Sequence, residues 1–549
     1  MHGLKRILKN FEQLELNLNS HHNETYQTAI PTSNPHKESQ LSSASNTSVV
    51  FPDIHTGKLI YSPYNEKEDK ILDFSSVGYK EGQQPIPSNI INTITKTVES
   101  NGIDDSNSIQ EALDFISRQP LDSTGFRGIV QLKQGVYYLS NPLNINNSGV
   151  IFQGDPNGGS LLENIGQNTN LIRIQGSPNI LAKKRVAIAD EMLPVGSTQL
   201  TIKHADRRYK CGDIIIVAIQ FNDNWIKAVG MDIIHPKGDT TKNNGWRPGK
   251  FEHFRHIVAI QGDIITLNSP LTTRLEKKYG GGYVELYQSS RVNNIGLQHL
   301  VFIDRRNSQK NKEDIMRDEK SKVKDYRFAA EMFDQVLIEM NHAENCWVKE
   351  VTSVWWRNFI RLGTNTLAIT LNKCNHTFPG ENSSTKQSII PIVGQFGFEI
   401  SGQLILVEHC HVENSFHAYS FKGRIPGPNV IYKSECTGKL GDVGPHMKWS
   451  SGQLYDNCNF EGQMIIQDRY DAGSGHGWSG ANCVIWNTVA HSGMVVQKPP
   501  TAQNFLFGSS SARGKARIAH HPWAWEELPD TRVYPPSLYL AQLHDRQFA

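Results

Sequence analysis

Three short segments in the last third of the chain gather residue types that can move protons and bind anions. They read NSFHAYSFKGRIPGPN, GDVGPHMKWSSG and IIQDRYDAGSGHGWSGAN. Histidine can act as a general base or acid, and Arg and Lys pair with carboxylates. Tryptophan offers a flat apolar face to a sugar ring and an N–H group for a hydrogen bond. The candidate site residues are His417, Lys422, Arg424, His446, Lys448, Trp449, Asp468, Arg469, His476 and Trp478.

This combination suits the chemistry of a sugar polymer that carries carboxylates. In β-elimination a cation neutralises the carboxylate and so acidifies the proton on the neighbouring carbon. A base removes that proton, and an acid assists the departing glycosidic oxygen. We assign His446 as the general base, His476 or Lys448 as its acid partner, and Arg469 and Arg424 as the carboxylate clamp. The predicted substrate-binding residues are His417, Lys422, Arg424, Trp449, Trp478 and Asp468.

Each of these residues also has a structural interpretation. A histidine in a loop is usually only polar surface, and the two tryptophans are equally suited to covering the ends of an apolar core. Asp468 beside Arg469 is compatible with a simple surface ion pair. Because two histidines each precede a tryptophan in neighbouring segments, the functional interpretation gains weight for that pair.

The elements that must position these residues recur along the chain. From about residue 345, short segments rich in Val, Ile, Thr, Asn and Gly return at drifting intervals of roughly 20 to 40 residues. This pattern is typical of a solenoid of stacked β-coils from which loops of variable length leave. Asparagines near the strand ends suit tight left-handed turns between neighbouring strands. These asparagines are Asn345, Asn429, Asn482 and Asn504.

A cysteine stands near the same point in four of these segments. The residues are Cys374, Cys410, Cys436 and Cys458. They predict a ladder of small inward-facing side chains. The seven cysteines of the chain show no Cys-x-x-Cys pair, which disfavours a zinc site, and their odd number and wide spacing disfavour a disulfide framework.

The sequence therefore predicts an all-β fold: a right-handed single-stranded parallel β-helix with an N-terminal capping helix and a small antiparallel β insertion. An α-solenoid would need long stretches of helical periodicity, and a β-propeller would need a steadier four-stranded repeat. The capping helix is expected in SIQEALDFI, after an N-cap at Ser106. Its apolar face comprises Ile109, Ala112, Leu113 and Ile116.

Composition shifts divide the chain into five parts. The predicted parts are a disordered leader at 1–70, the N-terminal cap and first coils at 71–182, the β-rich insertion at 183–285, the main β-helix with a substrate groove at 286–511, and a C-terminal cap extension at 512–549. The extension is expected to end in a short helix around Ser537 to Arg546. The loop within the insertion, DNWIKAVGMDIIHPKGDTTKNNGWRPG, is long and aromatic, which is typical of functional or disordered loops.

Ordered motifs from about Asp73 to the SLYLAQL segment resemble the pectate-lyase-like superfamily of parallel β-helix proteins. The stretch DDSNSIQEALDFI followed by GIVQLKQGVYYLSNPLNINNSGVIFQGD looks like the start of such a coil. The motifs GPH-x-x-W, Q-D-R and GHGW-x-GA resemble a bacterial subgroup. That subgroup more often has Arg before the tryptophan, so Lys448 keeps the charge but loses the bidentate fork.

The resemblance implies a carbohydrate-active protein, mostly polysaccharide lyases and glycoside hydrolases, with phage tailspikes and non-catalytic members among them. We expect a polysaccharide lyase that acts on an acidic polysaccharide. The first alternative is a glycoside hydrolase, which needs two carboxylates and would draw on Asp442, Asp456, Asp468 and Asp471, although no Asp-Asp doublet is present. The second is a non-catalytic carbohydrate-binding or adhesin-like β-helix. A monomer and a homotrimer both remain open.

The charge and hydropathy of the chain limit the kinds of partner that it can bind. The balance of 56 Lys and Arg against 54 Asp and Glu argues against nucleic-acid binding through bulk charge. No run approaches the roughly 18 apolar residues of a membrane span, and we recognise no signal peptide, so the location is unknown, although the family is mostly extracellular or periplasmic. No metal or cofactor is predicted. Ca²⁺ stays open, but the site carries more cations than carboxylates.

Overall fold

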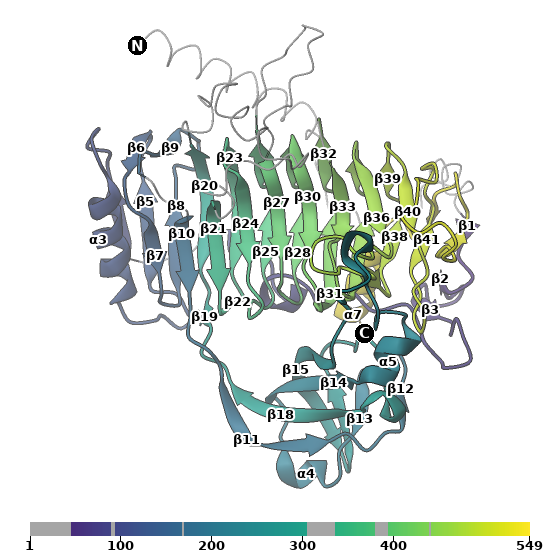
Figure 1. The fold of residues 1–549 in the computed structure, drawn as a ribbon. Helices are drawn as coiled ribbons and strands as arrows, with labels where there is room; N and C mark the ends of the chain where they lie inside the picture. The colour runs from purple at the N-terminus through teal and green to yellow at the C-terminus, as the bar shows by residue number, and fades with distance from the viewer. Residues whose placement is uncertain are drawn as a thin grey trace, which may run out of the picture. The chain divides into compact units, whose positions relative to one another are not determined.

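The computed structural model describes residues 45–88, 94–166, 170–304, 335–378, 394–438 and 441–548. Outside the insertion, short parallel strands pair with the equivalent strands of the next coil (Figure 1). The fold is a right-handed parallel β-helix, as the sequence predicts. Among the helices in these ranges, none is long and apolar enough to cross a membrane.

One face of the coil stack is a nine-stranded parallel sheet, which we call the long sheet. Each strand is hydrogen-bonded to the strands that come before and after it in this sheet along the chain, so each coil contributes one strand. The strands are β7 (Leu143–Ile145), β10 (Asn170–Gln175), β21 (Val336–Asn341), β24 (Asn358–Leu362), β27 (Gly394–Ile400), β30 (Ser415–Phe421), β33 (Asp442–Pro445), β36 (Gln463–Ile466) and β40 (Met494–Val496).

Two further rows of parallel strands complete the coils, and β20 and β23 belong to both rows. The first row comprises β4 (Thr95–Val98), β5 (Gly128–Leu132), β8 (Val150–Gln153), β20 (Gly296–Ile303), β23 (Trp347–Val354), β25 (Thr370–Asn372), β28 (Leu406–Glu408), β31 (Pro426–Tyr432), β34 (Ser450–Asp456), β38 (Val484–Trp486), β41 (Phe505–Phe507) and β42 (Trp525–Glu527). The second comprises β6 (Gly135–Leu139), β9 (Ser160–Asn164), β20, β23, β26 (Asn375–Thr377), β29 (His411–Glu413), β32 (Glu435–Thr437), β35 (Asn459–Phe460) and β39 (Val489–Ala490).

The interior is filled by side chains that stack from coil to coil. The predicted cysteine ladder is confirmed: all four cysteines are buried in one apolar cluster, joined by Cys346 and Cys483. The backbone N–H of Cys374 donates to Sγ of Cys410 on the next coil at 3.4 Å. Burial raises the pKa of the Cys346 thiol to about 12, so this ladder is packed structure rather than reactive chemistry.

The N-terminal cap is α3 (Ser106–Ser117), which buries the four predicted apolar residues against the first coils. The N-cap position differs from the prediction by one residue, because Asp105 occupies it and Ser106 begins the helix. The Oγ atom of Ser106 is engaged elsewhere: it donates to Asp104 and accepts from the N–H of Ser140.

The insertion forms a six-stranded antiparallel sheet, as predicted, that leaves and rejoins the coils between β10 and β20. The aromatic loop that follows β14 is folded and begins with the short helix α5 (Asp223–Ala228). The strands, in sheet order, are β11 (Ile180–Ala187), β18 (Gly282–Gln288), β14 (Ile214–Phe221), β15 (Gly249–Gln261), β16 (Ile264–Leu267) and β13 (Gln199–Thr201).

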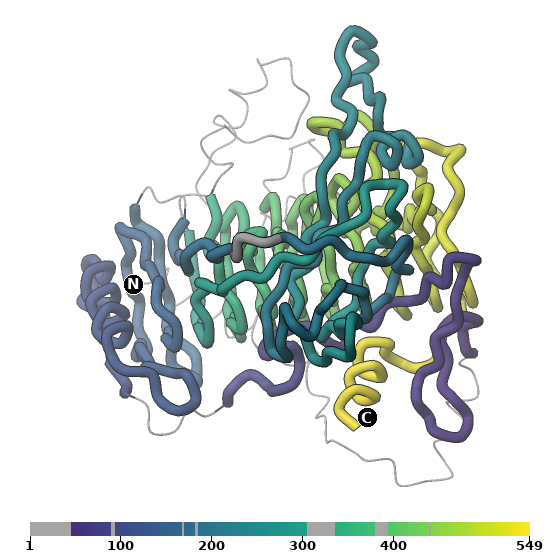
Figure 2. Tube along the Cα trace, turned by 90° about the horizontal axis from the view of Figure 1, so that it is seen from below, coloured from purple at the N-terminus to yellow at the C-terminus, as the bar shows by residue number. Residues whose placement is uncertain are grey.

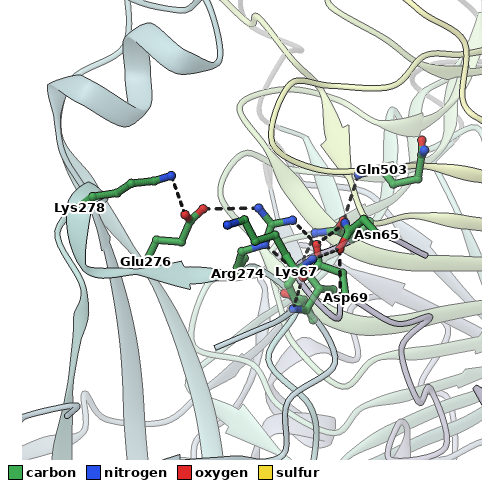
Figure 3. A network of polar contacts seen from close by, with 10 residues as sticks. Asn65, Lys67, Asp69, Arg274, Glu276, Lys278 and Gln503 are labelled. Atoms are coloured by element: carbon green, nitrogen blue, oxygen red, sulfur yellow. Dashed lines mark hydrogen bonds and ion pairs between the residues drawn. The ribbon is translucent and has the colours of Figure 1, made fainter. Parts of the chain in front are cut away.

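The insertion lies beside the later coils (Figure 2), and buried polar contacts join the two. The guanidinium of Arg255 is fully buried and donates to the carbonyl of Gly427 at 2.8 Å and to that of Pro270 at 2.7 Å. Figure 3 shows a second contact, in which Arg274 of the insertion pairs with Asp69 of the N-terminal segment. The insertion therefore reaches both the coils and the N-terminal segment.

The predicted leader at 1–70 needs a correction for its second part. Residues 1–44 lie outside the described residues, but residues 45–70 pack on the protein. They contain β1 (Ser45–Asn46), β2 (Val50–Pro52) and β3 (Leu59–Tyr61), with Val50 fully buried. Their polar composition hid this order, because strands of two or three residues carry little periodicity.

The C-terminal extension first adds a strand to the coil stack, and its last part then covers the stack. Strand β42 pairs in parallel with β41, and β43 (Val533–Tyr534) pairs with β1. The predicted last helix is α7 (Leu538–Gln547), with Ser537 as N-cap. Buried Asp456 of β34 accepts from Oγ of Ser537 and from the N–H of Tyr539, both at 2.8 Å, so a carboxylate fixes the start of α7.

The asparagine prediction is correct for two of its four residues. Asn345 and Asn482 have φ of 51° and 54°, the left-handed conformation expected at the turns. Asn429 and Asn504 are buried in the coils instead. Their Oδ1 atoms accept from the N–H groups of Ile405 and Cys483, so they satisfy backbone donors inside the stack.

Candidate functional site

Five polar side chains gather at one side of the long sheet, and we call them the histidine cluster. His417 lies on β30, Asp442 begins β33, and His446 directly follows β33. His417 and Asp442 are opposite each other in the pairing of their strands. Arg469 and His476 come from the segment after β36, one coil further on. The stacking of coils therefore brings together residues from three successive turns, as the sequence predicts.

Asp442 is the charged centre of the histidine cluster. It accepts a hydrogen bond from Nδ1 of His417, and Nη2 of Arg469 lies 3.0 Å from its second oxygen. Burial alone would raise the pKa of Asp442, but His417 and Arg469 outweigh it and hold that pKa well below its usual range. Asp442 is therefore ionised at neutral pH, and it fixes the orientation of both partners.

His446 is surrounded by other rings and by a cation. Its ring centroid lies 4.7 Å from that of His417 and 5.0 Å from that of His476. Nη1 of Arg469 lies 3.5 Å from its Nδ1 atom. Burial, together with His417 and Arg469, lowers the pKa of His446 to about 2. Burial and Arg469 lower that of His476 to about 4, so both rings are neutral at pH 7 in the free protein.

The remaining predicted cations lie around this cluster in two arrangements. Lys422 pairs with Glu399 of β27 at 3.2 Å, and its Nζ atom lies 4.5 Å from the ring centroid of Phe396. Arg424 and Lys448 lie beside the insertion: Nη2 of Arg424 donates to a backbone carbonyl, and Nζ of Lys448 donates to a hydroxyl.

The structure corrects the role predicted for the two tryptophans. Trp449 and Trp478 are each 1% exposed, so neither face is open to a sugar ring. Trp449 packs edge-on against Trp225 of α5 with ring centroids 4.9 Å apart. Nε1 of Trp478 donates to the carbonyl of Val229 at 3.1 Å. The aromatic loop of the insertion covers both residues, and their role is structural.

Asp468 also differs from its predicted substrate-binding role. Its side chain is 3% exposed; it accepts from the N–H of Tyr470 at 2.7 Å and faces Nε2 of His521 at 3.1 Å. Asp468 therefore ties the C-terminal extension to the coil instead of facing the histidine cluster. The ion pair suggested by the Asp468-Arg469 sequence is not formed, because Arg469 pairs with Asp442.

Sequence reasoning missed three residues near the site. Phe396 stacks on His417 with ring centroids 5.0 Å apart, and Glu399 binds Lys422. Phe416 is 47% exposed and lies edge-on to His417 at 4.5 Å, which makes it an open aromatic face beside the histidine cluster. The signal was present in QFGFEI and NSFHAYSF, since Phe396 and His417 are strand partners, but it depends on the register between coils.

Three residues of the histidine cluster form a possible set of metal ligands. Ligand atoms of His417, Asp442 and His446 all lie within 4.8 Å of one another. Two imidazoles and one carboxylate do not fit Ca²⁺, which takes six to eight oxygen ligands. They resemble a transition-metal set, but Arg469 already occupies one oxygen of Asp442 and adds a positive charge there. We therefore derive no step that uses a metal.

The fold and the site together define a parallel β-helix with a histidine-rich polar cluster at one side of its long sheet. No protein-family model and no curated protein matches this chain. Solved structures with a similar fold include the Geobacillus virus E2 protein ORF18, at 10% identity and a TM-score of 0.36 over 79% of this chain and 60% of that one.

Two bacterial enzymes are similar at the same level. The polygalacturonase of Erwinia carotovora ssp. carotovora has 12% identity and a TM-score of 0.35, over 81% of this chain and 99% of that one. The A-module of a mannuronan C-5 epimerase from Azotobacter vinelandii has 10% identity and a TM-score of 0.32, over 79% and 96%. We transfer no activity from these proteins, and the function is argued from the residues of this chain.

Proposed function

We propose that this protein cleaves an acidic, uronate-containing polysaccharide by β-elimination at the histidine cluster. The observation that carries the proposal is the contact between Arg469 and Nδ1 of His446. It pairs a cation that can bind a carboxylate with a neutral imidazole that can accept a proton. The open ring of Phe416 adds an apolar surface suited to a sugar.

The contact with Arg469 determines which nitrogen of His446 carries the proton. A guanidinium can only donate, so Nδ1 must accept and the ring proton lies on Nε2. Nδ1 is therefore the basic atom, but Arg469 covers it in the free protein. When a substrate carboxylate attracts the guanidinium, Nδ1 becomes free, and the negative charge of the substrate raises the pKa of His446.

The proposed reaction follows from this exchange. Arg469 binds the uronate carboxylate and acidifies the proton on the adjacent ring carbon. Nδ1 of His446 takes this proton, and the electron pair left on the carbon forms a double bond as the glycosidic oxygen departs. His476 and Lys448 are the two candidates that assist the departing oxygen. His476 is neutral at pH 7, because its pKa is about 4, and this favours Lys448 as the acid.

Glycosidic hydrolysis is less well supported by the four aspartates proposed for it. Hydrolysis needs a carboxyl group with a raised pKa as general acid. Asp442 has a lowered pKa, and so does Asp471, where burial is outweighed by Arg517. Asp468 is buried against His521. Burial raises the pKa of Asp456 to about 6, but it is fully buried under α7 and out of reach of a polymer.

The hypothesis that the protein only binds carbohydrate, without cleaving it, is also weakened. That alternative relied on Trp449 and Trp478 as stacking surfaces, and both are covered by the insertion.

The test is the ultraviolet absorbance of an unsaturated uronate, followed on a panel of acidic polysaccharides. We expect absorbance to grow with the wild type and to disappear in His446→Ala. His491→Gln is the matched control, since His491 is an exposed histidine on a neighbouring coil whose ring hydrogen-bonds to Oδ1 of Asn459. New reducing ends without absorbance would support hydrolysis instead. Binding without any product would support the non-catalytic alternative.

A further inference from the structure

Arg424 and Lys448, which we call the paired-cation site, lie on successive coils where the insertion meets the β-helix. The backbone N–H of Arg424 donates to the carbonyl of Lys448 at 2.7 Å. Gly423 makes this approach possible, because a Cβ atom there would lie 2.9 Å from Cβ of Lys448. The fold therefore places the two cationic residues next to each other on neighbouring coils.

Neither cation has an anionic partner in the part of the chain that the structure describes. Nζ of Lys448 donates to Oγ of Ser474 at 3.4 Å, and Nη2 of Arg424 donates to the carbonyl of Arg247 at 3.3 Å. Burial lowers the pKa of both side chains, and Arg424 lowers that of Lys448 further. Two half-buried like charges repel each other, and a bound anion would relieve that repulsion.

The insertion fixes the guanidinium of Arg424 from behind. The guanidinium carbon lies 5.1 Å from the ring centroid of Phe221, at the end of β14. A Cβ atom on Gly249, at the start of β15, would lie 3.1 Å from Nη1 of Arg424. This support reduces the conformational entropy that Arg424 would lose on binding an anion.

The paired-cation site directly adjoins the histidine cluster. The backbone N–H of Lys448 donates to the carbonyl of His476 at 2.9 Å, and Lys448 stands two residues after His446. Arg424 and Lys448 lie on the same two coils as His417 and His446, so a single polymer can contact both sites.

We propose that the paired-cation site binds a second carboxylate of the substrate, on the sugar next to the one that reacts at His446. This inference rests on the proposed function and narrows its substrate to polymers in which consecutive sugars are acidic. A polymer with one carboxylate on every second sugar would leave Arg424 and Lys448 unpaired.

The test measures accessibility of Lys448 rather than turnover. The full-length protein is labelled with trace acetic anhydride, and the modified lysines are quantified by peptide mass spectrometry. The probe is digalacturonate, which carries a carboxylate on each sugar, and its dimethyl ester is the neutral control. We expect digalacturonate to reduce labelling of Lys448 several-fold and the ester to have no effect. Lys133 is an internal control, because it is an exposed lysine that pairs with Glu99 on the first coils.

Two variants make the result decisive. Arg424→Gln should abolish the protection of Lys448, whereas Arg513→Gln, which removes a positive charge from an exposed surface pair, should leave it intact. Equal labelling of Lys448 with digalacturonate and with its ester would overturn the inference, as would full protection in Arg424→Gln.

The labelling and the elimination assay of the wild type together separate the two proposals. Protection in the absence of any elimination product from the wild type would support the paired-cation site and contradict the lyase reaction. Elimination by the wild type without protection of Lys448 would support the reaction and contradict the paired-cation site.

Discussion

Arg255 and Arg424 both lie where the insertion meets the β-helix, but their surroundings are opposite. Arg255 is fully buried, and its guanidinium donates to four backbone carbonyls and to Oε1 of Gln403. Arg424 is half-buried, lies over Phe221 and donates to one carbonyl. A cation whose donors are all used holds the fold together, whereas one with spare donors is available to a ligand. The difference separates structural charge from candidate binding charge.

The largest expected effect is the loss of stability in Arg255→Met. Five acceptors lose a hydrogen bond in the interior, and we expect the free energy of unfolding to fall by about 3 kcal/mol or more. Arg424→Met is the matched substitution and should change it by less than about 1 kcal/mol. Denaturant unfolding of the two variants measures this contrast, and similar losses in both would remove the distinction drawn between the two arginines.

Trp478→Phe should have the next largest effect. The substitution removes the hydrogen bond to Val229 and leaves a small cavity under the insertion, with an expected cost of about 1 to 3 kcal/mol. Phe416→Leu is the control, because Phe416 is 47% exposed and should tolerate the change within about 1 kcal/mol. If Trp478→Phe proved as mild as the control, the tryptophan would have to be open to solvent, and its sugar-binding role would return.

The fold could be predicted from the sequence because stacked coils produce patterns that are visible in short stretches of the chain. The spacing of short strands, the cysteine positions and the apolar face of α3 all follow from side-chain periodicity along the chain. The grouping of His417, His446 and His476 could also be predicted, since the three residues come from three successive coils.

The burial of Trp449 and Trp478 could not be predicted from the sequence, because it depends on contacts with a distant part of the chain. What covers them is α5 and the loop after it, more than 200 residues earlier, where the hydrogen bond from Trp478 to Val229 spans 249 positions. A tryptophan next to a histidine has the same local sequence whether it faces water or another domain element. The pairing of Arg469 with Asp442, rather than with its neighbour Asp468, likewise depends on coil register.

Buried histidines also make the stability of the protein depend on pH. The pKa values of His446, His476 and His376 are lowered to about 2, 4 and 3, with burial as the first cause, so these rings are neutral in the folded protein. In the unfolded chain they would protonate near pH 6.5. Stability should therefore be full above about pH 6.5 and decrease as the pH falls from there towards the folded values.

His446→Gln isolates one of these groups. Thermal unfolding between pH 8 and pH 4 should show a shallower loss of stability at acidic pH in His446→Gln than in the wild type, because one fewer histidine takes up a proton on unfolding. The exposed control His491→Gln should keep the wild-type slope. Identical slopes in wild type and His446→Gln would mean that His446 is not held neutral by its surroundings.

The smallest expected effect is that of metal ions on the stability of the wild type. It tests whether an anion whose partners are already in place, Asp442, is unavailable to a ligand. Asp442 is already bound by His417 and Arg469, so Zn²⁺ or Ca²⁺ should leave the unfolding temperature of the wild type unchanged. Arg469→Gln removes the competing charge and leaves two imidazoles and a carboxylate together, and this variant should gain stability with Zn²⁺ but not with Ca²⁺. Stabilisation of the wild type by either ion would show that Arg469 does not block the site, and the proposed exchange between Arg469 and the substrate carboxylate would then need a metal in place of the guanidinium.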